Sequence, residues 1–333
     1  MAEAFTIHEE LTRSGAHVRR LFRARLLRWY DGHRRELPWR ESRDPYRVWL
    51  SEIMLQQTRV NAVVEHYKRF LDMFPTVETL AAASLDSVLA AWSGLGYYRR
   101  ARMLHKAAQK VVQECGGQFP ASASELRELP GIGRYTAAAI ASIAYDEAVA
   151  VVDGNVERVL DRLLGQTLTE NEVWLQAENF LSPRRAGDYN QAMMELGATV
   201  CTPRAPQCLI CPVSELCATR GERASGKKPA KQVKREIGYV LDLRKGRVLL
   251  VPRGNDLSLM PGMWELPESG KSGNATKVAF TVRHSITTTD YVVRVSRQQL
   301  AKPRAGKRVP VARLAEMPLT GLARKILKTA NVF

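Results

Sequence analysis

Apolar side chains recur at three- and four-residue spacing from about Val18 to Cys217, as in the stretches SLDSVLAAWSGL and ARMLHKAAQKVV. One face of an α-helix repeats with this period, so the pattern predicts successive amphipathic helices. Ser84, and either Ser122 or Ser124, precede such stretches and can cap the first turn with a hydroxyl group. We therefore expect the first two hundred residues to be almost entirely helical.

Beyond this region apolar residues alternate with polar ones. The stretches IGYVLDL, RVLLVPR, VAFTVRHS and DYVVRV are rich in valine and aromatic residues, and a Lys245-Gly246 turn separates the first two. A period of two residues is typical of β-strands. Residues 220–235 combine basic side chains with glycine, serine and proline, as linkers do. We therefore predict a helical region at 18–219, a basic linker at 220–235 and a small α+β domain at 236–333.

The charge of the chain points to a polyanionic partner. Fifty Lys and Arg residues stand against 34 Asp and Glu, a formal net charge of +16. Basic side chains release counterions from phosphates when they bind nucleic acid, although charge alone leaves accidental binding open. No run of about 18 apolar residues occurs, so no membrane span is expected. The first twenty residues lack the apolar core of a signal peptide, so we expect a cytoplasmic, nucleoid-associated protein.

Four of the five cysteines lie close together in the sequence. Cys201, Cys208, Cys211 and Cys217 have the spacing C-x6-C-x2-C-x5-C, and Cys115 stands apart. A reducing cytosol disfavours two disulfides, and four neighbouring thiolates suit a multivalent cation. A structural zinc ion and an iron–sulfur cluster both take four cysteines, and the spacing alone does not separate them cleanly.

A short glycine-containing turn lies between two predicted helices at residues 129–133, LPGIG. Gly131 and Gly133 allow a tight turn, and the amides at the start of the next helix can bind a phosphate without reading sequence. Asp153 follows in VVDGNVERVLDRL, at the entrance to a helix that starts near Asn155. The helix dipole favours an ionised carboxylate there, suited to stabilising a cationic sugar, although Asp is also a common helix cap.

The hairpin, the following Asp and the cysteine spacing together resemble the endonuclease III superfamily of base excision glycosylases, over roughly residues 20–220. The segment LPWRESRDPYRVWLSEIMLQQTRV, at 37–60, resembles the adenine glycosylase family MutY. The resemblance implies a mainly α helix-hairpin-helix glycosylase fold with a [4Fe-4S] cluster on the four cysteines. It also implies a small α+β, Nudix-like C-terminal domain, which recognises the lesion but lacks the glutamate run needed for hydrolysis.

The resemblance assigns catalytic roles to four residues, namely Glu52, Asp153, Tyr135 and Asn155. Glu52 lies in a mostly apolar helix, where desolvation would raise its pKa and let it act as a general acid. Asp153 would stabilise an oxocarbenium-like sugar or add to it covalently. Tyr135 stands where bifunctional relatives have a lysine that forms a Schiff base, so we expect a monofunctional enzyme. Asn155 resembles a residue that hydrogen-bonds near the flipped nucleotide.

The resemblance also suggests how DNA is held and how the lesion is read. The base must leave the stack before Glu52 can reach it, which requires a wedge and a phosphate clamp. Candidates for the wedge and for strand and backbone contacts are Gln56, Gln57, Thr58, Gly131, Gly133, Arg134, Arg99 and Arg100. By register from His284, the lesion-reading triplet is Ile286, Thr287 and Thr288, which lacks the aromatic and imidazole groups found in many MutY proteins.

The expected function is monofunctional hydrolysis of the N-glycosidic bond of adenine mispaired with 8-oxoguanine or guanine in duplex DNA, by a protein that the family implies to be a monomer. Two alternatives remain open at this point. One is a thymine or oxidised-pyrimidine glycosylase of the same superfamily. The other is a non-catalytic helix-hairpin-helix protein that only binds DNA.

Overall fold

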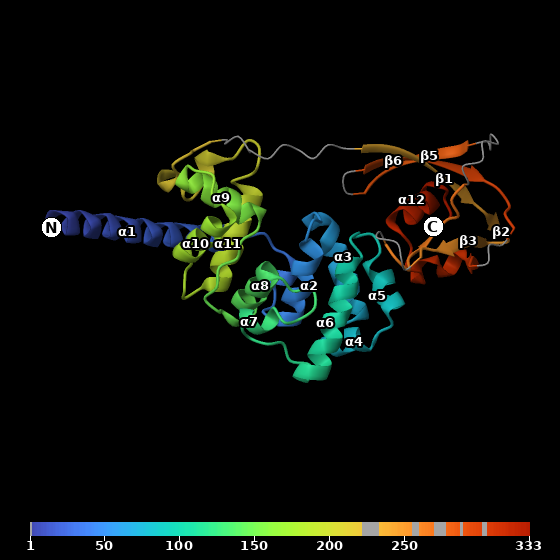
Figure 1. Ribbon diagram of the computed structural model, residues 1–333, viewed down its shortest axis with the longest axis horizontal. Helices are drawn as coiled ribbons and strands as arrows, with labels where there is room; N and C mark the ends of the chain where they lie inside the picture. The colour runs from blue at the N-terminus through green and yellow to red at the C-terminus, as the bar shows by residue number, and fades with distance from the viewer. Residues whose placement is uncertain (1, 222–232, 255–259, 270–277, 287–288, 302–304) are drawn as a thin grey trace. The chain divides into compact units, whose positions relative to one another are not determined.

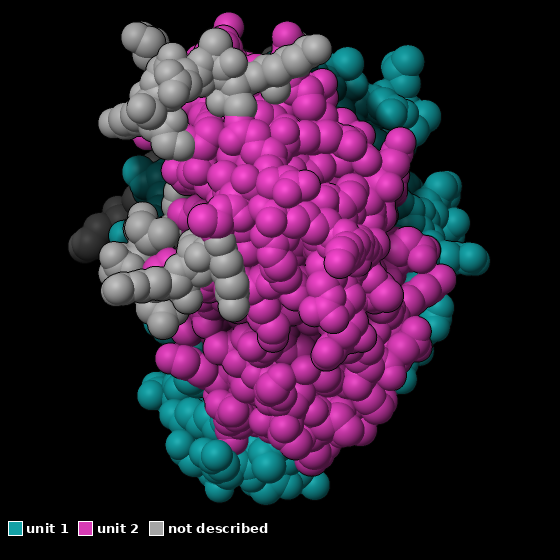
Figure 2. Space-filling view, turned by 90° about the vertical axis from the view of Figure 1, so that its right-hand side faces the viewer, with its two compact units in different colours: residues 1–57, 110–226 teal, residues 58–109, 227–333 magenta. Residues whose placement is uncertain are grey.

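The computed structural model describes residues 2–221, 233–254, 260–269, 278–286, 289–301 and 305–333 (Figure 1). The chain forms two compact units, which Figure 2 colours separately. The first unit comprises residues 1–57 and 110–226, and the second comprises residues 58–109 and 227–333. The division passes through the region predicted as one helical domain, because residues 58–109 join the strands rather than the other helices. The predicted domain boundaries stay a prediction, and the basic linker lies mostly outside the described residues.

The first unit is helical, as the periodicity predicts. Its elements are α1 (Ala2–His33), η1 (Pro38–Arg40), α2 (Pro45–Leu55), the end of α6 (Arg99–Cys115), α7 (Ala123–Leu126), α8 (Arg134–Tyr145), α9 (Gly154–Leu164), α10 (Glu170–Phe180), α11 (Ala186–Thr199), η2 (Cys208–Ile210) and η3 (Ser214–Leu216). Helix α1 begins well before Val18, where the pattern first became periodic. A core of apolar residues from α1, α9, α10 and α11 holds the unit together, and α8 packs against both α2 and α11.

Helix starts follow the capping residues seen in the sequence. The Ser84 hydroxyl accepts a hydrogen bond from the Ser87 amide at the start of α5 (Leu85–Trp92). Ser122, rather than Ser124, caps α7. Asp153 caps α9. These local hydrogen bonds satisfy amides that have no partner within the helix, which is why the starts were predictable.

The second unit combines helices with two small sheets. Its helices are α3 (Val60–Met73), α4 (Val77–Ala82), α5, most of α6, η4 (Val311–Glu316) and α12 (Gly321–Thr329). Its strands are β1 (Val233–Leu241), β2 (Leu243–Arg244), β3 (Arg247–Pro252), β4 (Trp264–Glu265), β5 (Val278–Ile286), β6 (Thr289–Arg297) and β7 (Lys307–Pro310).

The strand segments read from alternation are confirmed, and their pairing defines the sheets. In one sheet β6 lies between β1, to which it is parallel, and β5, to which it is antiparallel. In the other, β3 pairs with β2, β4 and β7. Helix α12 lies beside the strands in Figure 1 and buries Ile326 and Leu327 against them. None of the described helices is long and apolar enough to cross a lipid bilayer.

Candidate active site

A buried carboxyl group lies at the centre of the candidate site. Glu52, on α2, is only 6% exposed. The Tyr135 hydroxyl, on α8, donates a hydrogen bond to Glu52 Oε2 over 2.6 Å. Burial raises the pKa of Glu52 to about 7, with a further increase from the charge of Asp153, although the Tyr135 hydrogen bond and the charge of Arg40 lower it. Glu52 can therefore hold a proton near neutral pH and release it to a substrate.

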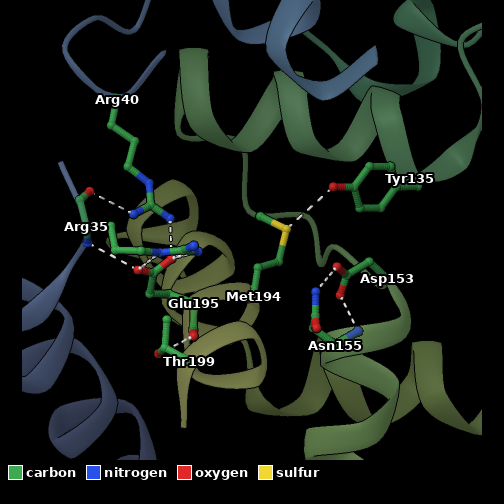
Figure 3. A network of polar contacts seen from close by, with 8 residues as sticks. All are labelled: Arg35, Arg40, Tyr135, Asp153, Asn155, Met194, Glu195 and Thr199. Atoms are coloured by element: carbon green, nitrogen blue, oxygen red, sulfur yellow. Dashed lines mark hydrogen bonds and ion pairs between the residues drawn. The ribbon is translucent and has the colours of Figure 1, made fainter. Parts of the chain in front are cut away.

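A second carboxyl group stands at the start of α9. Asp153 Oδ1 accepts hydrogen bonds from the Asn155 and Val156 amides, over 2.9 and 2.8 Å. Its Oδ2 accepts one from Asn155 Nδ2 over 2.7 Å, a contact drawn in Figure 3. The side chain is thus held in one orientation by three donors. The two carboxyl groups are close enough for the charge of Asp153 to raise the pKa of Glu52, so an acid and an anion share the site.

A charged cluster beside these residues carried no recognisable signal in the sequence. Glu195, on α11, is 1% exposed and accepts hydrogen bonds from Arg35 Nε (2.7 Å), Arg35 Nη2 (2.8 Å) and Arg40 Nη2 (2.8 Å) (Figure 3). Burial raises the pKa of Glu195, but the hydrogen bonds from the two arginines outweigh it and hold that pKa at about 2. The Tyr135 hydroxyl oxygen, whose proton is donated to Glu52, also lies 3.5 Å from the sulfur of Met194. Because Met194 precedes Glu195 on α11, this helix connects the charged cluster to Tyr135.

The hairpin predicted at 129–133 precedes α8. Gly131 has a positive φ of 77°, which glycine adopts without strain. Gly133 provides no side chain to cap α8, so the first amides of this helix are available to an anion. The Arg134 guanidinium lies over the Trp174 ring, 3.7 Å from its centroid, and 3.4 Å from Glu178. Arg134 is therefore held beside these amides.

The predicted wedge residues follow α2 directly. Gln56 ends the helix, and its Nε2 donates to Thr136 Oγ1 over 3.3 Å. Gln57 lies in a turn and has a positive φ of 55°, so its backbone is in the left-handed conformation. Arg99 is exposed, as a phosphate contact requires. Arg100, by contrast, is partly buried and donates a hydrogen bond to the Thr58 hydroxyl, so its guanidinium already has partners within the protein.

The four clustered cysteines line one partly open pocket, together with Arg162. Arg162 is 4% exposed, and its Nη1 contacts Cys201 Sγ at 3.3 Å and donates to the Thr202 carbonyl over 2.7 Å. Among the described residues, no three His, Cys, Asp or Glu side chains converge tightly enough to hold a single metal ion. Four thiols around one pocket, with the buried Arg162 beside them, are a set of residues that can hold an iron–sulfur cluster. A bound cluster would link the four thiolates and close this loop.

Arg158 connects the cysteine loop to the candidate site. Its Nε donates to the Cys201 carbonyl over 2.8 Å, and its Nη2 donates to Asn155 Oδ1 over 2.8 Å and to the Gly197 carbonyl over 2.7 Å. Gly197 also lies so close to Asn155 that an added Cβ would stand 2.6 Å from the Asn155 Cβ. The Asn155 amide is thus fixed from both sides, and through it the orientation of Asp153.

Only one residue of the predicted lesion-reading triplet lies within the described part of the chain. Ile286 ends β5, and Thr287 and Thr288 lie outside the described residues. Their role stays a prediction. His284, from which the register was counted, is partly buried beside Gly321, at the start of α12.

Comparisons with known proteins agree with this geometry. Residues 50–181 match the HhH-GPD superfamily of base excision DNA repair proteins, and residues 201–217 match the iron–sulfur binding domain of endonuclease III. A solved thermostable thymine-DNA glycosylase is 30% identical with a TM-score of 0.58, over 61% of this chain and 97% of that one. The chain therefore belongs to the HhH-GPD superfamily, and its cysteine loop carries a [4Fe-4S] cluster.

Within this superfamily the chain is similar to proteins named adenine DNA glycosylase. The mouse protein is 51% identical over 59% of this chain, the human protein 50% over 60%, and the Arabidopsis thaliana protein 41% over 73%. The matched regions cover 41%, 39% and 46% of those proteins, so the chain spans less than half the length of these three relatives.

Proposed function

We propose that this protein removes adenine mispaired with 8-oxoguanine or guanine from duplex DNA, without cleaving the strand. The observation that carries the proposal is the buried Glu52, with a pKa raised to about 7 and an anion, Asp153, nearby. The mouse, human and Arabidopsis thaliana adenine glycosylases are 41–51% identical to the chain and the thymine glycosylase 30%, which favours adenine over thymine as the base. The acid and anion pair also favours an enzyme over a protein that only binds DNA.

The chemistry follows from the two carboxyl groups. Adenine leaves poorly unless it is protonated, so the flipped base takes a proton at N7 from Glu52 while the bond between the base and the sugar C1′ breaks. Positive charge then develops on the sugar, and the fixed Asp153 carboxylate stabilises it. A water molecule adds to C1′ and gives up a proton, which restores Glu52. Asn155 acts by holding Asp153 in place.

Strand cleavage by a Schiff base is not expected at this site. Such a step needs an amine at the position after the hairpin, and Tyr135 occupies it. The tyrosine instead donates its hydroxyl proton to Glu52 in a hydrogen bond. That bond lowers the pKa of Glu52, so Tyr135 tunes the acid rather than forming a covalent intermediate.

DNA binding is proposed to use the hairpin amides with Gly131, Gly133, Arg134 and Arg99 on the phosphates. Gln57, in its left-handed backbone conformation, is the proposed wedge, and the protein is proposed to act as a monomer. The net charge of +16 supports a phosphate-rich partner. The C-terminal strands are proposed to form a Nudix-like domain that senses 8-oxoguanine through Ile286, Thr287 and Thr288.

Base release from four duplexes tests the proposal. They carry adenine opposite 8-oxoguanine, adenine opposite guanine, thymine opposite guanine, and adenine opposite thymine. We expect adenine release from the first two, with strand breaks only after alkali. Release of thymine would favour the pyrimidine glycosylase, and the absence of any release would favour a binding protein.

The pH dependence of adenine release gives a further prediction. A general acid works only while protonated, so the single-turnover rate is expected to be high below pH 7 and to fall as pH rises through about 7. Tyr135→Phe removes a hydrogen bond that lowers the pKa of Glu52, so the fall should move to higher pH. Tyr145→Phe, which removes a hydroxyl bonded to the Phe119 carbonyl, is the matched control. An unchanged midpoint in Tyr135→Phe would contradict the role of this bond.

Arg158→Lys is predicted to weaken catalysis while the cluster stays in place. Lysine keeps the charge but cannot reach the Cys201, Gly197 and Asn155 oxygens together. We expect the single-turnover rate to fall about 10- to 100-fold, because small displacements of a catalytic group are costly. Iron content and visible absorbance should match the parent protein. A loss of activity that only follows the loss of iron would show that Arg158 supports the cluster and not Asp153.

A further inference from the structure

The loop at residues 93–98, between α5 and α6, has a closely defined shape. Three of its residues have positive φ, namely Gly94 (111°), Gly96 (70°) and Tyr97 (48°). A Cβ added to Gly94 would stand 2.8 Å from His66 Nε2. The buried Trp92 indole donates to the Gly96 carbonyl over 3.1 Å. The loop is therefore braced from within and has little freedom to change shape.

One side of this loop contacts the segment that precedes α12. Ser93 Oγ and Tyr98 OH both donate to the Leu319 carbonyl, over 3.1 and 3.2 Å. All three residues are at most 3% exposed, and two donors occupy both lone pairs of the carbonyl oxygen. The residues that flank Leu319 pair with Trp264 of β4, since the Trp264 amide donates to the Pro318 carbonyl and the Thr320 amide donates to the Trp264 carbonyl. The loop is thus anchored to the segment at residues 318–320, which pairs in turn with β4 of the second sheet.

A second contact supports the same attachment. The Arg102 guanidinium, in the first turn of α6, donates a hydrogen bond to the Pro261 carbonyl. Pro261 lies in the turn that leads into β4. Pro261 and Leu319 are far apart in the sequence, and each lies in a segment that adjoins β4. Both therefore contact the region of α5 and α6.

Another side of the loop contacts Thr58, the last residue of the proposed wedge turn at residues 56–58. Arg100 Nη2 donates to Thr58 Oγ1 over 3.2 Å and contacts the Leu95 and Gly96 carbonyls at 3.3 and 3.4 Å. Its guanidinium carbon lies 5.4 Å from the Trp92 ring centroid and 5.3 Å from that of Tyr97, within the range of cation–π attraction. Arg100 therefore ties Thr58 to the carbonyls of the loop.

We propose that the loop at residues 93–98 mechanically couples the C-terminal strands to the wedge turn, with Ser93, Tyr98 and Arg100 as positioning residues. The proposal rests on the proposed function, in which the strands sense the base opposite adenine and Gln56 to Thr58 open the stack. Recognition of 8-oxoguanine then fixes the strands, the strands fix the loop through Leu319, and the loop fixes Thr58 through Arg100. Arg100 acts within the protein and does not contact a phosphate.

A double-mutant cycle tests this coupling. One arm is Ser93→Ala with Tyr98→Phe, which removes the two hydroxyl groups. The other arm is Arg100→Lys, which keeps the positive charge but loses the planar fork. Single-turnover adenine release is measured opposite 8-oxoguanine and opposite guanine. We expect each arm to lower the first rate about 5- to 20-fold and the second less than about threefold, and the combined variant to lose no more than either arm.

Amide hydrogen exchange at residues 56–60 of the free protein provides a readout independent of activity. Both arms should speed exchange there, whereas Tyr145→Phe, which loses a comparable hydroxyl–carbonyl bond elsewhere, should not. The melting temperature of Ser93→Ala with Tyr98→Phe is compared with that of Tyr145→Phe, and equal or higher values exclude loss of fold as the cause. If the double variant melts at a lower temperature, Tyr98→Phe alone replaces it in the cycle. Unchanged exchange, additive rate losses, or equal losses on both duplexes would overturn the coupling. A parent protein that releases no adenine would instead overturn the proposed function.

Discussion

Glu52→Gln is expected to reduce the single-turnover rate of adenine release by about 10²- to 10⁴-fold, the range that a positioned general acid contributes. Glutamine has nearly the same shape and can still accept the hydrogen bond from Tyr135, but it has no acidic proton to give. Removing a buried ionisable group also spares the cost of burying its charge. The folded protein and its affinity for mispaired DNA should therefore survive, which titration with a fluorescent duplex checks.

The matched control for this variant is Glu65→Gln on the exposed part of α3. It makes the same substitution at a solvent-exposed position and should leave the rate of adenine release near that of the parent protein. If Glu52→Gln released adenine at the parent rate, Glu52 would not be the acid. If it lost mispair binding as well, its role would be in holding the base and not in proton transfer.

Asp153→Asn is expected to lower the same rate by about 10²- to 10³-fold, as the loss of one electrostatic stabiliser of a transition state does. The substitution removes the negative charge that is proposed to stabilise the developing positive sugar. Asparagine is also a good helix cap, and its side-chain oxygen can still accept the Asn155 and Val156 amides. The melting temperature should therefore change little, which thermal unfolding measures.

Asp153→Glu shows, in the same experiment, whether Asp153 acts through its negative charge or only as a helix cap. Glutamate restores the charge but moves it outward by one methylene group, so we expect a rate between those of Asp153→Asn and the parent protein. A normal rate in Asp153→Asn together with a lowered melting temperature would reduce Asp153 to a helix cap. The pH profile adds an independent check, because loss of the Asp153 charge should move the fall in rate to lower pH.

Much of the fold and the centre of the site could be predicted because their signals are local. Periodicity gave the helices and strands, and capping serines gave helix starts. Glu52 is surrounded in sequence by apolar residues on one helix, so its burial and raised pKa could be inferred. The cysteine spacing lies within 17 residues, which made the metal loop recognisable from the sequence.

Other features could not be predicted because they depend on residues far apart in the chain. Glu195 finds its partners Arg35 and Arg40 only when α11 packs beside η1. Arg100 was expected to face a phosphate because nothing near it in sequence shows that Trp92, Tyr97 and Thr58 surround it. Residues 58–109 have the same helical periodicity as their neighbours, so the pattern did not reveal that they pack with the second unit.

The cluster of Arg35, Arg40 and Glu195 also sets when the site can form during synthesis. Arg35 and Glu195 are 160 residues apart, and a ribosome adds about 5–20 residues per second. Roughly 10 to 30 s therefore pass between the synthesis of the two partners. During that interval α2 and Glu52 exist without the carboxylate that pairs with Arg35 and Arg40. A nascent chain that ends before Glu195 would leave Arg35 and Arg40 without their buried partner, so this cluster beside Glu52 can form only late in synthesis.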